Sequence, residues 1–464
     1  MKGFVPTPPE LVDLMVKKLF AGGAPRPDRL VLDPGCGTGA FLGGILRWCA
    51  AHQAAVPHVV GVESDDRHLA AARSVVAGHG TVAVEHRDFL ADDSRRFDYV
   101  VGNPPYVAIT RLSEREKHAY RRRYETAVGR FDLYILFFEQ ALRQLRPGGR
   151  LVFITPEKFL YVKTAEPLRR LLAALYVEEI ELVDEEVFPG LVTYPTITTV
   201  ERRPANKPTR VVLRDGSVRD VSLPNDGASW LPRILNEESS ASEATTTLGD
   251  VCVRVSCGVA TGADEVFVHA ERDVPPSLRP FAHPTVSGRE LNGAAVQPPS
   301  RYVMLVPYDR HGQLLPFDRL GALGRFLARP ETRTHLEQRT CVRHKPWYAF
   351  HENPPLPDIL RPKILCKDIG RTSRFWVEER GDIVPRHSVY YIVPTDPAMV
   401  RPLAEYLNSA AAQAWLAGHC QRAASGFLRL QSSILRQLPL PPGLVPDERP
   451  RRAGLNGEAV AAEA

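Results

Sequence analysis

The chain has 464 residues, of which 44% are hydrophobic and 24% charged, and its formal net charge is +5. This length is too great for one ordinary hydrophobic core, so we expect a globular protein of two or three domains. The sequence contains no apolar run of membrane-spanning length, and no apolar stretch of the signal-peptide kind follows its first residues. We therefore expect no membrane association and a cytoplasmic location.

The seven cysteines are scattered along the chain and form no C-x-x-C pair. Reduced thiols are therefore expected, rather than disulfides or a metal site. The mildly basic charge is compatible with a nucleic acid partner but does not establish one.

Short apolar runs alternate with helical stretches as far as residue 154. The predicted strands are residues 30–33, 58–62, 82–84, 97–101 and 150–154, and the predicted helices are residues 40–46, 65–77 and 133–145. This alternation predicts an α/β fold with a doubly wound, Rossmann-like sheet. Ligands bind at the carboxyl edge of such a sheet, so residues at the strand ends are the first candidates for a site.

A glycine-rich turn, residues 34–39, joins the first predicted strand to the first helix. Such a turn lets a ligand approach the backbone, but it lacks both G-x-G-x-x-G and the Gly-Lys-Ser/Thr of a phosphate loop. Asp33 precedes the glycines, which suits a ligand with an ammonium group. Glu63 ends the second strand and is placed to accept both hydroxyls of a ribose, although a solvated strand end is the alternative.

The fourth strand leads into Asn103, Pro104, Pro105 and Tyr106. The amide oxygen of Asn103 and the carbonyl of Pro104 can accept both N–H bonds of an exocyclic amine, while the ring of Tyr106 stacks on the heterocycle that carries it. The alternative is a plain turn, because Asn-Pro opens turns and Pro-Pro stiffens loops.

The order of these segments resembles that of the S-adenosylmethionine-dependent N6-adenine DNA methyltransferases, in the gamma arrangement of the Taq-type and Eco57-type enzymes. The matching segments are residues 4–12, 33–39, 63, 88–90, 103–106, 131–135 and 147–149. The resemblance implies a Rossmann-like catalytic domain that binds S-adenosylmethionine. It also implies direct methyl transfer to a flipped-out adenine, without a covalent enzyme intermediate.

Specific roles follow from the resemblance for ten residues. The expected cofactor-binding residues are Thr7 near the methionine end, Asp33 and Gly35 beside the amino acid part, Glu63 at the ribose, and Asp88 with Phe89 at the adenine. The expected catalytic residues are Asn103, Pro104, Pro105 and Tyr106. No metal is expected to take part.

One departure from the family concerns a second aromatic residue that faces the flipped base in relatives. It is expected shortly after Val187-Phe188-Pro189, where this chain has residues 194–200. We expect Val200 or a neighbour in its place, with Tyr194 as a substitute or as a strand residue of the core.

Basic residues gather after the expected catalytic loop. Residues 110–130 hold seven Arg or Lys against three Glu, including Arg121, Arg122 and Arg123. We expect these three to contact DNA phosphates, with a solvated helix face as the alternative.

The second half of the chain is expected to read the target. We predict a catalytic domain at residues 1–235, a linker around 237–243, a mixed α+β target-recognition domain at 246–442 and a disordered tail at 443–464. Arg289 and Lys367 are the expected DNA contacts there, the latter within a segment, 361–376, that mixes basic and aromatic residues. A plain strand pair is the alternative for that segment, and residues 400–416 are predicted to form one helix.

The sequence therefore predicts a site-specific adenine-N6 DNA methyltransferase of a restriction–modification or phage-defence system. Double-stranded DNA is the expected partner, a separately encoded restriction endonuclease is a second candidate partner, and a monomer is expected. The alternatives are a methyltransferase acting on RNA bases or protein glutamine, and a non-catalytic DNA specificity subunit.

Overall fold

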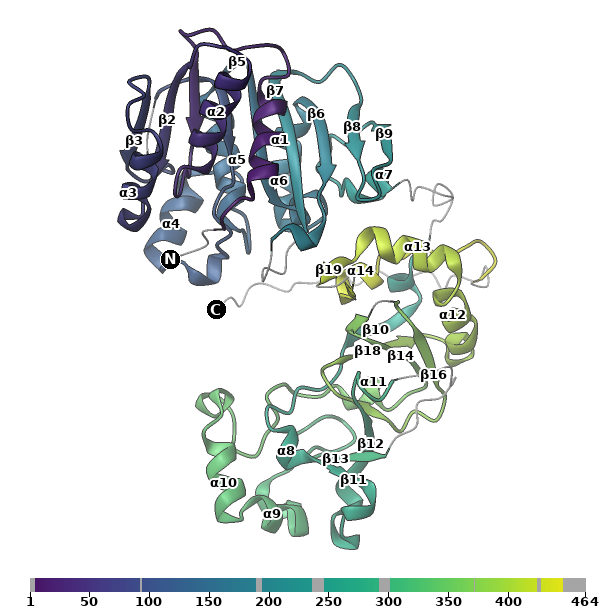
Figure 1. Ribbon diagram of the computed structural model, residues 1–464. Coiled ribbons are helices and arrows are strands. Elements are labelled where there is room, and N and C mark those ends of the chain that lie inside the picture. The colour runs from purple at the N-terminus through teal and green to yellow at the C-terminus, as the bar shows by residue number, and fades with distance from the viewer. Residues whose placement is uncertain are drawn as a thin grey trace. The chain divides into compact units, whose positions relative to one another are not determined.

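The computed structural model describes residues 5–91, 94–188, 194–235, 246–291, 301–370, 372–423 and 427–444 (Figure 1). The chain divides into two compact units, Met1–Ser239 with Ala417–Arg429, and Ser240–Leu416 with Leu430–Ala464. The predicted linker at 237–243 and most of the predicted tail lie outside the described residues. The roles assigned to the two domains stay predictions.

A nine-stranded sheet forms the centre of the first unit, in the order β3-β2-β1-β4-β5-β7-β6-β8-β9. Its strands are β1 (Leu30–Asp33), β2 (His58–Glu63), β3 (Val82–His86), β4 (Phe97–Gly102), β5 (Leu145–Pro156), β6 (Leu175–Leu182), β7 (Pro195–Pro204), β8 (Thr209–Val212) and β9 (Val218–Val221). The first five pair in parallel, β7 runs antiparallel to β5 and β6, β8 is parallel to β6, and β9 is antiparallel to β8. The predicted doubly wound α/β fold is confirmed.

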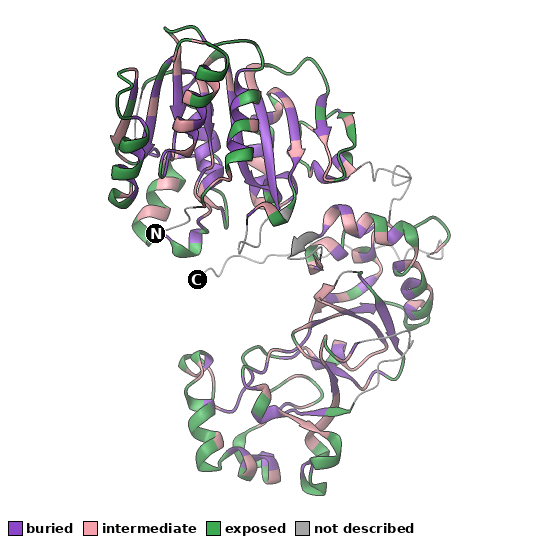
Figure 2. Ribbon diagram, in the orientation of Figure 1, coloured by how far each residue is buried: buried purple, intermediate pink, exposed green. Residues whose placement is uncertain are grey.

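Helices cover both faces of this sheet because consecutive strand residues point to opposite sides. Helices α1 (Pro9–Leu19) and α2 (Ala40–Ala51) share a hydrophobic core with Val101 of β4, whereas α5 (Leu133–Gln144) and α6 (Glu166–Ala173) share another with its neighbour Val100. In Figure 2 the central strands are largely buried and the outer sides of the helices exposed. This burial on both faces explains why the strands read as continuous apolar runs.

The two helices on the first face approach each other closely at a glycine. A Cβ atom added to Gly44 of α2 would lie 2.4 Å from Cγ1 of Val12 of α1. A side chain at this position would force α1 away, and α1 directly follows the N-terminal segment 5–8 that reaches the sheet edge. Helix packing therefore holds that segment in place.

Residues 202–235 belong to the sheet more than the sequence indicated. Strands β8 and β9 extend the sheet, and α7 (Leu231–Leu235) follows the fully buried Trp230. Their polar composition reflects an edge of the sheet, where alternate residues face solvent.

The second unit contains two four-stranded sheets, ordered β10-β18-β14-β16 and β11-β13-β12-β17. Their strands are β10 (Cys252–Cys257), β11 (Val268–Ala270), β12 (Ala282–Val286), β13 (Tyr302–Leu305), β14 (Lys363–Lys367), β16 (Phe375–Glu378), β17 (Val384–Pro385) and β18 (Val389–Pro394). The helices are α8 (Asp264–Phe267), α9 (Gly321–Leu327), α10 (Pro330–Glu337), α11 (Leu356–Ile359), α12 (Val400–Leu407) and α14 (Ser432–Leu435). The short strand β15 (Ile369–Gly370) also belongs to the second unit, whereas β19 (Gln421–Ala423) and β20 (Phe427–Arg429) belong to the part of the chain grouped with the first unit.

The helix predicted at 400–416 is broken into α12 and α13 (Ala410–His419). The side chain of Asn408 donates a hydrogen bond to the carbonyl of Phe375, at 2.9 Å, and accepts one from its N–H, at 3.0 Å. Helix α12 ends where the side chain of this asparagine hydrogen-bonds the backbone of a strand that is distant in the sequence. Local periodicity does not reveal such a contact. Leu403 and Leu407 are buried as predicted, but Ala411 is exposed.

The segment 361–376 forms the predicted strand pair, β14 with β16, and its aromatic residues point inward. Phe375 and Trp376 are buried, and Lys363 is wholly inaccessible. These three residues therefore offer no surface to DNA, whereas Lys367 is half-buried and its DNA contact stays a prediction. Lys363 instead forms an ion pair with Glu378 across the two strands.

This buried pair generates a stability prediction. Burial lowers the pKa of Lys363, against the raising effect of Glu378, and Oε1 of Glu378 also accepts the Gly381 N–H at 2.8 Å. Glu378→Gln keeps that acceptor but leaves a buried ammonium without its counter-charge, so we expect a loss of about 3–5 kcal/mol in the free energy of unfolding, measured in urea.

The matched control adds Lys363→Met to Glu378→Gln. Removing both charges should recover most of the loss, because well-packed neutral residues replace a buried pair at little cost. A double variant as unstable as the single one would contradict this account.

Candidate active site

A cavity of about 730 Å³ lies in the first unit, at the carboxyl ends of β1, β2 and β4. Seven of the ten predicted cofactor-binding and catalytic residues line it, namely Thr7, Gly35, Glu63, Asp88, Phe89, Asn103 and Pro105. Asp33, Pro104 and Tyr106 are not among the lining residues. The fold thus brings together segments that are far apart in the sequence, as expected for the carboxyl edge of a parallel sheet.

The cavity wall is predominantly acidic. Five carboxyl side chains line it against two guanidinium groups; the carboxyls are Glu63, Asp65, Asp66, Asp88 and Glu116. Both guanidinium groups are engaged: Nε of Arg67 lies 2.8 Å from Asp65, and Nε of Arg87 lies 2.9 Å from Glu85. This charge distribution favours a cationic ligand over a phosphate-bearing one.

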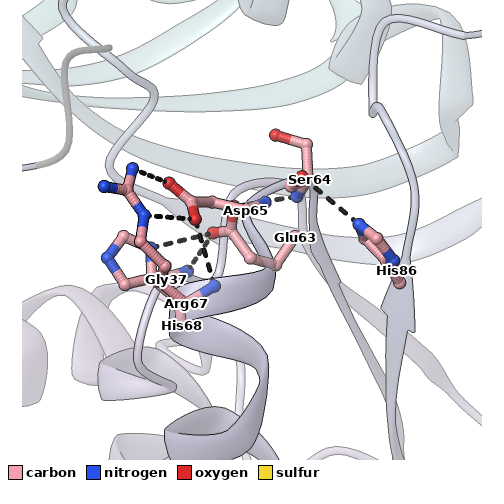
Figure 3. Close-up of polar contacts among 7 residues, drawn as sticks. All are labelled: Gly37, Glu63, Ser64, Asp65, Arg67, His68 and His86. Carbon is pink, nitrogen blue, oxygen red and sulfur yellow. Dashed lines mark hydrogen bonds and ion pairs between the residues drawn. The ribbon is translucent and has the colours of Figure 1, made fainter. Parts of the chain in front are cut away.

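Glu63 ties the glycine loop to the start of α3 (Asp66–Val75), as Figure 3 shows. The Gly37 N–H donates to Oε2 of Glu63 at 2.9 Å, and the N–H groups of Ser64 and Asp65 donate to Oε1 at 2.8 and 2.7 Å. Carboxylate oxygens have further lone pairs, so three amide bonds leave acceptor capacity for a ligand hydroxyl. Asp65 in turn caps α3 by accepting the Arg67 N–H at 3.1 Å.

Asn103 is held in one orientation by the N-terminal segment. Its Nδ2 donates to the Val5 carbonyl and to Oγ1 of Thr7, each at 3.1 Å. Its Oδ1 is buried and has no hydrogen-bond partner. Because both amide hydrogens are used, the side chain presents a fixed, unsatisfied acceptor. Thr7, predicted near the methionine end of a cofactor, therefore also positions Asn103.

Asp33 lies behind the glycine loop and is fully buried. Neither carboxylate oxygen accepts a hydrogen bond of good geometry. Burial raises the pKa of this carboxyl to about 8, the charge of Glu63 adds to the shift, and the nearby Gly35 amide opposes it. Asp33 is not among the lining residues of the cavity, and its contact with an ammonium group stays a prediction.

Tyr106 is half-buried and packs edge-to-face with Tyr134 at a centroid distance of 6.4 Å. Its hydroxyl is buried without a partner, and burial raises its pKa. Phe89 is likewise buried and packs against Phe137 at 5.0 Å, whereas Asp88 is exposed and accepts the Leu90 N–H at 2.9 Å.

The predicted replacement for the second aromatic does not reach the cavity. Val200 is buried in β7, paired with Leu151 and Val177. Tyr194 is also buried, with the Arg214 guanidinium 5.1 Å from its ring centroid. Residues 189–193, which follow Phe188 directly, lie outside the described residues.

The predicted DNA contacts differ in exposure. Arg121 and Arg122 of α4 (Glu114–Arg123) are exposed, whereas Arg123 is half-buried, its guanidinium 5.7 Å from the Tyr124 ring centroid. In the second unit Arg289 is exposed and Lys367 half-buried. Within that unit a separate cavity of about 370 Å³ is bordered by two exposed arginines, Arg325 and Arg329, which the sequence did not single out.

Several cavity residues escaped the sequence prediction. Leu112, Glu116 and Tyr120 also line the cavity, and the four-residue spacing of Glu116 and Tyr120 was the available signal for one helix face. Among the described residues, no cluster of three His, Cys, Asp or Glu could hold a metal ion, and no helix could span a membrane.

Comparison with known proteins gives relatives over nearly the whole chain. A model of the Eco57I restriction-modification methylase family matches residues 68–188. Type II methyltransferase M.PaeR7I of Pseudomonas aeruginosa is 29% identical over 503 residues, covering 95% of this chain and 86% of that protein. M.XhoI of Xanthomonas vasicola is 29% identical over 474 residues, covering 89% and 85%.

Two further similarities are limited, one by its coverage of the chain and the other by its low sequence identity. RM.Eco57I of Escherichia coli, a type II restriction enzyme and methyltransferase, is 36% identical over 202 residues, which cover 38% of this chain and 20% of that protein. Among solved structures, the type IIL restriction-modification enzyme MmeI in complex with DNA matches with a TM-score of 0.64 at 12% identity, covering 92% of this chain and 64% of that one. The latter concerns the fold alone.

The buried carboxyl of Asp33 gives a pH-dependent prediction. A carboxyl whose pKa is raised in the folded state destabilises the protein progressively as pH rises from its unfolded pKa, about 3.9, towards 8. Asp33→Asn removes this titration, so the variant should gain a few kcal/mol over the wild type at alkaline pH and little at pH near 4, in unfolding measurements without ligand. Asp88→Asn, an exposed carboxylate of the same cavity, should show no such gain. If the free energies of unfolding of Asp33→Asn and wild type changed with pH in parallel, the conclusion that the Asp33 carboxyl is buried without a compensating partner would be contradicted.

Proposed function

We propose that this chain, which belongs with the Eco57I restriction-modification methylases, is a site-specific DNA methyltransferase that transfers a methyl group from S-adenosylmethionine to N6 of adenine. The observation that carries the adenine assignment is the fixed, unsatisfied Oδ1 of Asn103, a residue that lines the cavity. An exocyclic amine is the donor that such an acceptor suits.

The charge of the cavity wall suits the cofactor. The acidic wall suits a ligand that carries a sulfonium and an ammonium group, and Glu63 retains acceptor capacity for ribose hydroxyls. Thr7, Gly35, Asp88 and Phe89 are the other residues proposed to hold it. When bound, S-adenosylmethionine supplies an electrophilic methyl group.

The residues of the chain act by positioning the acceptor amine. Oδ1 of Asn103 and the carbonyl of Pro104 each accept one N–H of the amine, which directs its lone pair towards the methyl group. Pro105 keeps the loop rigid, and the nitrogen loses a proton after transfer. No side-chain nucleophile is required, because the amine itself is the nucleophile.

A base within a duplex cannot reach this cavity, so the target adenine flips out of the stack. The role proposed for Tyr106 is to stack on that base, which requires its ring to leave the packing against Tyr134 seen here. Stacking of a base on an aromatic ring is worth roughly 1–3 kcal/mol, enough to offset part of the cost of flipping.

DNA is favoured over RNA or protein as substrate because the similarity to type II methyltransferases extends over 95% of the chain, including its second half. In that half, Arg289 and Lys367 stay proposed contacts, and the exposed Arg325 and Arg329 are further candidates for phosphate binding. A non-catalytic specificity subunit would have no need for the ordered Asn103 site. We further propose a cytoplasmic monomer and a restriction endonuclease as functional partner.

The assignment is tested by incubating the protein with radiolabelled S-adenosylmethionine and duplex DNA, RNA or protein, and by identifying the methylated nucleoside by mass spectrometry. We expect label in DNA and N6-methyladenine as the product. Methylcytosine as the product would overturn the adenine assignment, and label confined to RNA or protein would overturn the DNA assignment.

Asn103→Ala should lower kcat by about 10²–10³-fold or more, because it removes the acceptor that orients the amine, while the Kd for S-adenosylmethionine stays within a few-fold of wild type. Calorimetry and single-turnover methylation separate these quantities. A variant that keeps most of its turnover would assign the chemistry elsewhere.

Thr7→Val tests how Asn103 is oriented. The isosteric change removes one of the two acceptors of the Asn103 amide while keeping its volume, so we expect kcat to fall by roughly tenfold through misorientation. The control is Thr38→Val, which changes a lining residue of the same cavity that has no contact with Asn103 among the hydrogen bonds of the described residues. Equal effects of both substitutions would contradict a specific role for Thr7.

A further inference from the structure

Helix α4 (Glu114–Arg123) follows the catalytic loop and has two chemically distinct faces. Leu112 before the helix, and Glu116 and Tyr120 within it, line the cofactor cavity. Glu116 and Tyr120 are four residues apart and lie on one side of the helix, so this side of α4 borders the cavity.

Tyr120 is the side chain on this wall best suited to contact a ligand. It lies in the electrostatic neighbourhood of Asp88 and Glu116, and burial together with these charges raises its pKa to about 12. Its hydroxyl therefore stays protonated and available as a donor or acceptor. The ring shares the cavity with Asp88 and Phe89, the residues proposed for the cofactor adenine.

The opposite face of α4 is basic and exposed. Arg115, His118 and Arg122 all lie on it, since Arg122 is two residues, or about 200°, from Tyr120 around the helix. Arg115 and Arg122 have no ion-pair partner among the described residues, in contrast to Lys117, which pairs with Glu114 at 2.7 Å. Unpaired guanidinium groups on an exposed helix face suit phosphate contacts.

Helix α4 makes few contacts with the rest of the unit. None of its residues is fully buried, its partly buried Tyr120 packs against the hydrophobic core, and a helix of 10 residues is marginal on its own in water. Its ends are fixed: Ser113 and Glu116 form a capping box at the start, and the hydroxyl of Tyr124, just after the end, donates to the Leu90 carbonyl at 2.9 Å. That last bond attaches α4 to the segment that carries Asp88 and Phe89.

We propose that α4 couples the two substrates: Tyr120 contacts the nucleoside end of the cofactor, Arg115 and Arg122 contact a DNA phosphate, and each ligand strengthens the binding of the other. The inference rests on the proposed DNA methyltransferase function. A ligand on either face orders the same helix. The second ligand then binds a helix that is already ordered, so its binding does not include the entropy cost of ordering the helix. Coupling of this kind is reciprocal.

The test measures the Kd of S-adenosylhomocysteine, which cannot be turned over, by calorimetry on the full chain with and without a saturating mixed-sequence DNA duplex at low salt. For the wild type we expect the duplex to lower the Kd by about 5–30-fold. Tyr120→Ala should raise the Kd measured without DNA several-fold, and the ratio of the Kd without duplex to the Kd with duplex should fall towards one. Arg115→Gln with Arg122→Gln should leave the Kd without DNA within twofold of wild type but also remove the DNA effect.

Arg73→Gln is the matched control, since Arg73 is an exposed arginine of α3 that does not line the cavity. It should keep the full DNA effect. Hydrogen exchange provides an independent readout: amides of residues 114–123 should gain protection with either ligand and most with both.

Three results would overturn the coupling: no change of Kd on adding duplex, an unchanged Kd for Tyr120→Ala without DNA, or a full DNA effect in the double arginine variant. If the wild type methylates DNA in the labelling assay, these results refute the coupling alone. Absence of DNA methylation by the wild type refutes the proposed function, and the coupling with it.

Discussion

The structure of the site depends on the two hydrogen bonds that the Asn103 amide donates to the N-terminal segment. An asparagine side chain is nearly symmetric in shape, so only its hydrogen-bond partners decide which atom faces the cavity. Val5 and Thr7 supply two acceptors, which leaves the oxygen for the substrate. The N-terminal segment is in turn fixed by α1, whose close packing on α2 requires a glycine at position 44.

Hydrogen bonds to the backbone also order the part of the cavity around Glu63. The carboxylate of Glu63 accepts hydrogen bonds from three backbone N–H groups in the glycine loop and at the start of α3. A residue that the sequence presents as a ligand contact is therefore also the connection between two loops. Loss of its charge would disturb the cavity shape as well as any ribose contact, so substitutions at Glu63 alone cannot separate the two roles.

Local patterns in the sequence were sufficient for strands β1 to β5 of the sheet and for seven of the residues that line the cavity. The strand at residues 30–33 and the helix starting at residue 133 have the predicted bounds or nearly so, because parallel strands and amphipathic helices carry strong apolar periodicity. The failures depend on distant residues. The break at Asn408 requires Phe375, and the inward orientation of Lys363 requires Glu378 on the neighbouring strand. Neither partner is visible in a local window.

The two faces of α4 place a constraint on how the site works. A well-buried helix would form a more stable wall for the cofactor cavity, yet α4 has no fully buried residue. It is held by its capping box, by the packing of Tyr120 against the core and by the Tyr124 hydroxyl just beyond its end. The folded state of such a helix is only marginally stable, so contacts on its outer, basic face measurably change the fraction of molecules in which the helix is ordered. A flipped base and a methyl donor must be present together for transfer. A wall stabilised by both ligands favours the complex that contains both over either complex with one.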